Sequence, residues 1–189
     1  VGLGRTGRLL ASSWAGLEPD FLCLSKALSG GILPLSAVVV RKGIDAAFMG
    51  HPSRSFLHSH TYTGNPITCR AAAESLSLLT EPATGEHIET LTTWLDEARR
   101  EVAEAVPAIV ATRQAGLIVA FDLSPSVRTA VPDGRVSRSI RRAALERGVL
   151  LRPLHDTVYW MPPACLDRDD VRHLAAVTIE ALRVVSSPA

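Results

Sequence analysis

The spacing of apolar residues predicts four helices along the chain. Asn65 followed by Pro66 is a typical helix start and predicts a helix over 67–79. A second helix is expected over 86–106, with its apolar residues on one face. Gly148 would end a third helix over 137–147, and Asp167 would cap a fourth over 167–185. The apolar face of the second helix is assigned to Ile88, Leu91, Leu95, Ala98 and Val102. The apolar face of the fourth helix is assigned to Val171, Leu174, Ile179 and Leu182.

Shorter apolar runs have the length and composition of β-strands. The runs 21–24 and 35–40 are expected to be neighbouring buried strands. A short connection with Gly and Pro joins them, which favours an antiparallel hairpin at the edge of an otherwise parallel α/β sheet. Further strands are expected at 117–123, 149–152 and 158–161, the last two pairing across a turn at His155 and Asp156.

Glu81, Pro82 and Gly85 interrupt the helical pattern and mark the expected boundary between two domains. Residues 1–84 are expected to be the C-terminal part of a large α/β domain. Residues 85–189 alternate strands and helices and are expected to form a smaller α+β domain. A chain of 189 residues is long enough for such an arrangement.

Net charge, the length of apolar runs and the cysteine content exclude several classes of protein function. The net charge of +1 argues against a nucleic-acid partner and against a polybasic membrane surface, and no apolar run reaches the roughly 20 residues of a membrane span. Cys23, Cys69 and Cys165 are widely spaced and odd in number, so core thiols in a reducing cytoplasm are expected, and no metal site is suggested.

Lys26 stands at the end of the first apolar run, before Gly30 and Gly31. A buried ammonium is costly, and burial makes the amine a better nucleophile. Only two lysines occur, and Lys42 lies at a polar strand end, so Lys26 is the candidate for covalent chemistry. A lysine that extends its amine from a strand edge into solvent is the alternative.

Two motifs in register carry a family resemblance. Residues 19–31, with Lys26-Ala-Leu-Ser-Gly-Gly, resemble the lysine motif of the class III aminotransferases, and Gly2-Leu-Gly-Arg-Thr-Gly7 resembles that family's upstream signature. The similarity runs almost end to end. It implies a fold-type-I pyridoxal-phosphate (PLP) enzyme whose catalytic Lys26 binds PLP covalently. The family's pyridine-binding aspartate and first phosphate loop precede these motifs, so the chain is expected to be a C-terminal portion, with activity belonging to the parent enzyme.

The polar stretch 51–66 has the length of a functional loop. The resemblance implies that this loop crosses a homodimer interface, where Thr61 donates to the partner's PLP phosphate. It also places His60 at the cofactor and Ser59 at the substrate. Ser59 and His60 depart from the Gly-Pro of the adenosylmethionine-using enzymes, which leaves S-adenosylmethionine or lysine as amino donor.

Arg152 lies between apolar residues and Pro153, so its guanidinium requires an anionic partner. The resemblance implies that Arg152 binds a substrate carboxylate and that Tyr159 lines the same pocket. An internal salt bridge is the alternative; its possible partners are Asp156, Asp167, Asp169 and Asp170. The cluster of Arg138, Arg141 and Arg142 is expected to be a solvated helix face.

Within the class, the segments Leu-Arg152-Pro and Tyr159-Trp-Met-Pro-Pro163 are most similar to the branch that aminates 8-amino-7-oxononanoate in biotin biosynthesis. The resemblance therefore implies small-molecule substrates and transamination. Two alternatives remain: a class III aminotransferase acting on ω-amino acids, and a non-enzymatic fragment that retains the fold without the cofactor.

Overall fold

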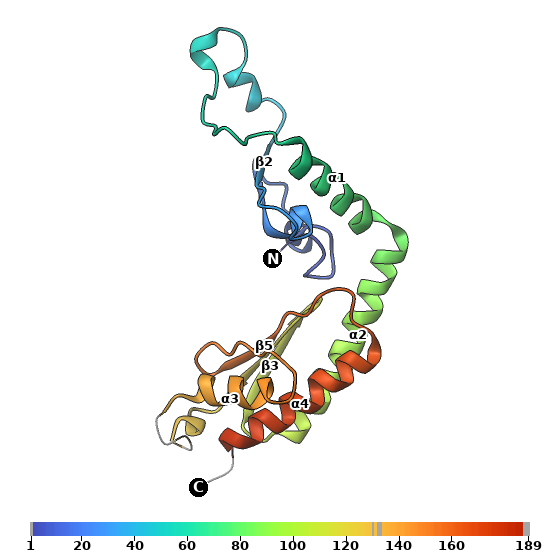
Figure 1. Ribbon diagram of the computed structural model, residues 1–189, viewed down its shortest axis with the longest axis vertical. Coiled ribbons are helices and arrows are strands. Elements are labelled where there is room, and N and C mark those ends of the chain that lie inside the picture. Colours follow the sequence, from blue (N-terminus) through green and yellow to red (C-terminus); the bar gives the residue numbers. More distant parts are fainter. Residues whose placement is uncertain (1, 130, 132–133, 187–189) are drawn as a thin grey trace. The chain divides into compact units, whose positions relative to one another are not determined.

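The computed structural model describes residues 2–129, 131 and 134–186. The chain forms two compact units, shown in Figure 1. The first unit contains the residues up to Gly4 and Arg8–Gly85. The second unit contains Arg5–Gly7 and the residues from Glu86 onward. The interpretation of these units as parts of a cofactor domain and a small domain stays a prediction.

The first unit contains an antiparallel strand pair. Strands β1 (Phe21–Leu24) and β2 (Ala37–Val40) pair from Phe21 opposite Val40 to Leu24 opposite Ala37. The predicted antiparallel pairing is therefore present. The prediction that both strands are buried is wrong, because Phe21, Val38 and Val39 are more than half exposed. No further strand of the described residues adds to this pair, and a two-stranded sheet alone cannot cover both of its faces.

The first unit also contains short 3₁₀ helices; they are η1 (Ala11–Ala15), η2 (Lys26–Ser29), η3 (Asp45–Phe48) and η4 (Pro52–Arg54). Helix α1 (Pro66–Thr80) follows them. The Asn65 side-chain oxygen accepts from the amides of Ile67 at 2.9 Å and Thr68 at 3.4 Å, so the predicted cap is confirmed. Leu28 of η2, Ala72 of α1 and Leu3 form a small apolar core in this unit.

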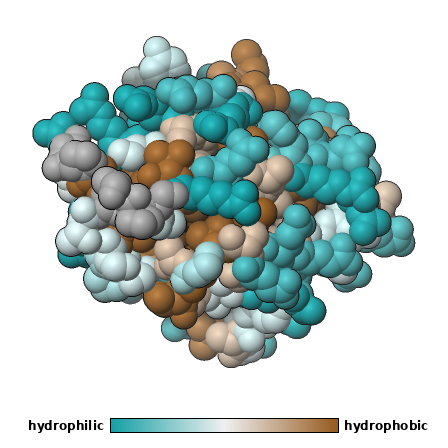
Figure 2. Space-filling model, turned by 90° about the horizontal axis from the view of Figure 1, so that it is seen from below, coloured by the Kyte–Doolittle hydropathy of each residue, from teal (hydrophilic) through white to brown (hydrophobic). Residues whose placement is uncertain are grey.

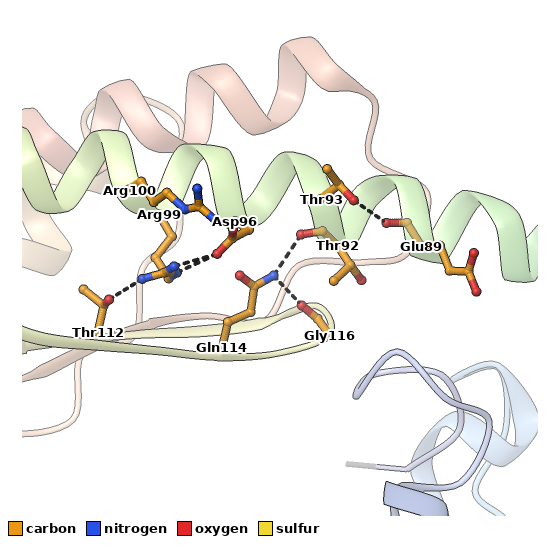
Figure 3. Close-up of polar contacts among 9 residues, drawn as sticks. All are labelled: Glu89, Thr92, Thr93, Asp96, Arg99, Arg100, Thr112, Gln114 and Gly116. Carbon is orange, nitrogen blue, oxygen red and sulfur yellow. Dashed lines mark hydrogen bonds and ion pairs between the residues drawn. The ribbon is translucent and has the colours of Figure 1, made fainter.

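Helix α2 (Pro82–Ala105) begins four residues before the predicted start, because the helix includes Gly85. Its five predicted inward residues, from Ile88 to Val102, are all buried. The Arg99 guanidinium binds the carboxylate of Asp96 at 2.6 Å and the hydroxyl of Thr112, which links α2 to the sheet of the second unit (Figure 3).

The second unit is built on a three-stranded antiparallel sheet in the order β3 (Ile109–Ala115), β4 (Ile118–Leu123), β5 (Thr157–Trp160). Val119 and Phe121 of the central strand are fully buried. The main core also takes residues from α2, from α3 (Val136–Leu145) and from α4 (Arg168–Ser186). A 3₁₀ helix, η5 (Pro125–Arg128), follows β4.

The second unit corrects two expectations about strands. Residues 149–152 form no strand; the amide of Val149 donates instead to Ala144 O at 3.0 Å, in the C-terminal turn of α3. Strand β5 accordingly pairs with β4, and only an isolated bridge joins Leu154 to Thr157. Strand β3 was not predicted, because as an edge strand it carries polar residues such as Thr112 and Gln114.

Other expectations concern the surface. The cysteines Cys23, Cys69 and Cys165 are exposed, so the prediction of core thiols is wrong. Asp167 does cap α4, since its carboxylate accepts from the amides of Asp169 and Asp170.

Figure 2 shows one face of the molecule, on which apolar residues lie between hydrophilic ones. Among the described residues, no helix is both long and apolar enough to cross a membrane.

Candidate active site

Lys26 lies just beyond the end of strand β1 and is the first residue of η2. The prediction of a buried lysine within the strand is wrong, because Lys26 is exposed. The turn after Leu24 carries the side chain out of the strand pair, and Ser25 Oγ secures this turn by donating to Leu35 O at 3.1 Å. Lys26 has a φ of 50°, a left-handed conformation that costs a non-glycine residue about 1 to 2 kcal/mol.

The backbone that follows Lys26 is firmly anchored. Leu28 and Ser29 are buried, and the Ser29 hydroxyl donates to Leu33 O. From α1, Ser75 Oγ donates to Ala27 O at 3.1 Å. These contacts hold a strained residue in place, and such strain is concentrated at functional positions.

The Lys26 amine makes no hydrogen bond or ion pair with any residue that the structure describes. An amine held on a fixed turn without a carboxylate partner is available for a covalent bond to a carbonyl compound. This is the chemistry that PLP requires of its lysine. The exposed, unpaired amine therefore fits the aldehyde of PLP.

The predicted phosphate-binding residues lie in a tight turn before α1. His60 Nδ1 accepts from the Tyr62 amide at 3.1 Å, and Thr63 Oγ1 accepts from the His60 amide at 3.0 Å. Thr61 is exposed between them, and neither its amide nor its hydroxyl has a partner among the described residues. Two free donors on an ordered turn suit a phosphate dianion.

Ser59 is also exposed and precedes this turn. Ser59, His60, Thr61 and Lys26 all belong to the first unit. Within the described part of that unit, no hydrogen bond or ion pair joins Lys26 to the turn at 60–63. Within one chain, Lys26 and the turn that contains Thr61 are therefore not joined by a direct bond among the described residues.

Arg152 and Tyr159 belong to the second unit. Arg152 is exposed, and the described residues supply no partner for its guanidinium. Each of the four aspartates considered as its internal partner makes other bonds. Asp156 pairs with Arg128, and Asp169 pairs with Arg172 at 2.8 Å. At the start of α4, the carboxylates of Asp167 and Asp170 each accept a hydrogen bond from the other residue's backbone amide. The internal salt bridge is therefore absent among the described residues.

Tyr159 lies on β5 opposite Ala120 and lines an open cavity of about 390 Å³. Leu151 lines the same cavity, whereas Arg152, the next residue, does not. The other lining residues are mainly apolar; they include Val149, Met161, Pro163 and Leu166. Tyr159 thus lines a cavity whose wall contains many apolar residues but also Asp170 and His173, and Arg152 directly follows one of the lining residues.

Sequence reasoning assigned no role to Arg5 beyond its motif. In the structure the Arg5 guanidinium donates to Pro162 O, 157 positions away in the chain. The signal in the sequence was an arginine in a glycine-rich segment, but nothing near it in sequence indicated the partner.

Comparisons with known proteins agree on one family. The profile named "Aminotransferase class-III" matches residues 1–182. The adenosylmethionine-8-amino-7-oxononanoate aminotransferase of Synechococcus elongatus is 38% identical over 186 residues, which is 96% of this chain and 42% of the relative. The Helicobacter pylori protein of the same name is 34% identical, with the same coverage.

Solved structures give the same result for the fold. The adenosylmethionine-8-amino-7-oxononanoate aminotransferase of Methanocaldococcus jannaschii matches with a TM-score of 0.86 and 28% identity, over 96% of this chain and 43% of that one. A PLP-bound amine transaminase from an uncultivated Pseudomonas species matches with a TM-score of 0.84 and 29% identity, over 96% of this chain and 42% of that one.

The chain spans about two fifths of the length of the curated relatives it matches. Its fold is that of the fold-type-I PLP-dependent transferases, of the α/β class. With a family profile matching nearly the whole sequence, the chain belongs to the class III aminotransferases.

Proposed function

We propose that the chain is the C-terminal part of a cytoplasmic, PLP-dependent aminotransferase that converts 8-amino-7-oxononanoate to 7,8-diaminononanoate in biotin biosynthesis. The observation that carries this proposal is the exposed, unpaired amine of Lys26 on its anchored left-handed turn. The names of the relatives, at 38% and 34% identity, support the choice of substrate.

Lys26 performs the proton transfers in this proposal. PLP, when bound, supplies an aldehyde for the amine and a conjugated ring that accepts electrons from the reacting carbon. In the first half-reaction, the freed Lys26 amine removes a proton from the amine-bearing carbon of the donor. In the second, Lys26 returns a proton to C7 of the oxo acid, which becomes an amine-bearing carbon.

Thr61 binds the cofactor phosphate of the partner subunit in the proposed homodimer. Its amide and hydroxyl are free among the described residues, and His60 shapes the turn that presents them. Ser59 contacts the substrate beside this turn. Each site is then completed by the other subunit, so that a symmetric dimer has two composite sites.

Arg152 binds the distal carboxylate of 8-amino-7-oxononanoate, and Tyr159 lies along its aliphatic chain. A planar guanidinium suits a carboxylate because it donates two parallel hydrogen bonds. The proposal is supported by the absence of an internal carboxylate partner for Arg152 among the described residues. The apolar residues of the neighbouring cavity, such as Leu151 and Met161, suit a hydrocarbon chain.

The test is an assay of the complete enzyme with 8-amino-7-oxononanoate as acceptor and either S-adenosylmethionine or lysine as donor. Formation of 7,8-diaminononanoate with one of the two donors is expected. A second candidate is an amine or ω-amino acid transaminase, which the likeness to the Pseudomonas amine transaminase favours. Turnover of simple amines or ω-amino acids, without 7,8-diaminononanoate formation, would select this candidate. Absence of any turnover would indicate a protein that retains only the fold.

A further inference from the structure

Arg152 lies on a segment that is not part of the sheet. The backbone of residues 150–152 makes no hydrogen bond with another described residue, whereas Tyr159 is paired with β4. The buried side chain of Leu151 anchors the segment on one side of Arg152. On the other side, the place of Arg152 depends on the turn that leads into β5.

That turn is a two-residue hairpin loop formed by His155 and Asp156. Leu154 and Thr157 close it with two backbone hydrogen bonds, of 2.8 and 3.0 Å. His155 has a φ of 52°, in the left-handed region that the first residue of such a loop adopts and that glycine adopts most readily. A histidine keeps this conformation only where its surroundings hold it.

Three elements of the second unit contact the loop through polar groups. Ser137 Oγ of α3 donates to His155 O at 2.8 Å. The amide of Leu123, the last residue of β4, donates to Asp156 O at 2.8 Å. The Arg128 guanidinium of η5 donates through Nε to one oxygen of the Asp156 carboxylate at 3.1 Å and through Nη2 to the other.

The ion pair between Arg128 and Asp156 is the strongest of these contacts. It is bidentate, so it fixes the direction of the carboxylate as well as its distance. The hydrogen bonds from Arg128 lower the pKa of Asp156 from its ordinary value of 3.8, so both groups are charged at neutral pH. Beside the loop lies an open cavity of about 440 Å³, and Arg128, His155 and Asp156 are among the residues that line it. With open space on this side, the loop relies on its polar contacts.

We propose that Arg128 and Asp156 are positioning residues of the transamination: their ion pair fixes the hairpin loop and thereby the place of Arg152, which binds the substrate carboxylate. A guanidinium that binds a carboxylate through two parallel hydrogen bonds is sensitive to small displacements, because both bonds must align. The placement of Arg152 rests on the proposed function, whereas the fixing of the loop does not.

Hydrogen exchange of the complete enzyme, measured by mass spectrometry, tests the fixing of the loop without any activity. Peptides that span the loop should exchange faster in Arg128→Ala and in Asp156→Ala than in the wild type. Arg168→Ala is the matched control, because it also removes an exposed ion pair between two elements of the second unit, with Glu97 of α2 at 3.3 Å. It should leave exchange across the loop unchanged.

Kinetics of the complete enzyme test the placement of Arg152. Arg128→Ala and Asp156→Ala should each raise KM for 8-amino-7-oxononanoate roughly three- to fivefold, because an exposed ion pair has a modest coupling energy, and should leave kcat within about twofold. The direction separates geometry from charge. If only charge mattered, loss of the Arg128 cation would raise this KM and loss of the Asp156 anion would lower it, since the substrate meets this region with its carboxylate. The PLP absorbance at saturating cofactor should be the same in all these proteins.

The effect on KM should also depend on Arg152. In the Arg152→Ala enzyme, the further change Arg128→Ala should not raise KM again, because the group that the loop places is gone. A merely structural role of Arg128 would add the same loss in both backgrounds. Arg168→Ala should leave KM unchanged in either.

The outcomes separate the loop, its role and the proposed function. Unchanged exchange across the loop in either folded variant, or equally faster exchange in Arg168→Ala, overturns the fixing of the loop and with it the placement of Arg152. Faster exchange with KM unchanged, with KM changes of opposite sign, or with the same further loss in the Arg152→Ala enzyme overturns the placement alone. A wild-type enzyme inactive on 8-amino-7-oxononanoate contradicts the proposed function and the placement, and the exchange result then judges the fixing of the loop.

Discussion

The indole N–H of Trp160 donates to the hydroxyl of Thr178 at 3.0 Å, and both side chains are buried. This bond joins β5 to α4 inside the main core of the second unit. The Thr178 hydroxyl donates in turn to Leu174 O, and the Trp160 ring meets Phe121 edge to face at 4.9 Å. The segment that carries Tyr159 is thus fixed to a helix by one polar contact in an apolar surrounding.

Thr178→Val should destabilise the protein by about 1 to 3 kcal/mol, because the indole N–H stays buried without an acceptor. Thr178→Ser keeps the hydroxyl and should lose less. Denaturant unfolding monitored by tryptophan fluorescence measures both. Thr90→Val is the control, since Thr90 is exposed on α2 and makes the same kind of bond to its own helix, with Glu86 O. Equal stability of Thr178→Val and Thr178→Ser would contradict the role of this hydrogen bond.

Acid should weaken the contact between β4 and its neighbours. The Arg113 guanidinium, and after it the Thr157 hydroxyl, lower the pKa of Asp122 from its ordinary value of 3.8. Because the pKa is lower in the folded state, the ionised carboxylate stabilises the fold above the ordinary value, and this contribution is lost as pH falls toward the folded-state pKa. The effect should be small, since Arg113 is largely exposed.

We therefore expect Asp122→Asn to lower the free energy of unfolding at pH 7 and to have less effect at pH 3. Unfolding curves at pH 7, 5 and 3 measure the difference. Glu104→Gln, on an exposed part of α2, is the control for a change of charge alone. A difference between wild type and Asp122→Asn that stays constant with pH would show that the carboxylate charge does not stabilise the fold.

Borohydride reduction of the PLP-loaded complete enzyme should attach the cofactor to Lys26. The reason is the unpaired amine on its anchored turn, together with the presence of only one other lysine. Peptide mass spectrometry identifies the modified residue, and Lys26→Ala should lose the visible absorbance of the bound cofactor. Lys42→Ala serves as control and should keep it. Recovery of the reduced cofactor on Lys42 would end the assignment.

Arg152→Ala should weaken the use of the carboxylate-bearing acceptor and spare cofactor binding. If the bound substrate carboxylate forms a hydrogen-bonded pair with Arg152 that the complex buries, removing the guanidinium predicts a loss of roughly 30-fold or more in kcat/KM. Steady-state kinetics with 8-amino-7-oxononanoate, and a PLP titration, measure the two properties. Arg138→Ala is a matched control, because Arg138 is also exposed and its guanidinium has no partner among the described residues. Kinetics equal to those of the wild type would leave the Arg152 guanidinium without a role in binding.

A mixed dimer of Lys26→Ala and Thr61→Val subunits should regain activity. If each active site combines Lys26 of one subunit with Thr61 of the other, one site of the mixed dimer carries both substitutions and the other site carries neither. The Thr61→Val enzyme alone should bind PLP more weakly, since a hydrogen bond to a charged group contributes about 1.5 to 3 kcal/mol. Subunit exchange at limiting PLP, checked by native mass spectrometry, is the measurement. If verified mixed dimers regain nothing, Thr61 acts within its own chain.

Sequence alone determined the features that depend on near neighbours. The Asn65-Pro66 start of α1, the buried stripe of α2 and the Asp167 cap follow from contacts within a few residues, because helix capping and helical periodicity are local. The antiparallel pairing of β1 and β2 followed from a short connection. The two family motifs likewise identified the class without a structure.

Only the tertiary structure decided burial and strand pairing, because these depend on residues far apart in the chain. Phe21 of the apolar run before Lys26 is more than half exposed, and no further described strand adds to the pair. Lys26 itself follows the strand in a left-handed conformation. Residues 149–152 are as apolar as a strand but lack a paired neighbour. Arg5 finds its acceptor at Pro162, 157 positions away, because a buried carbonyl without a local donor accepts from whichever segment the fold brings to it.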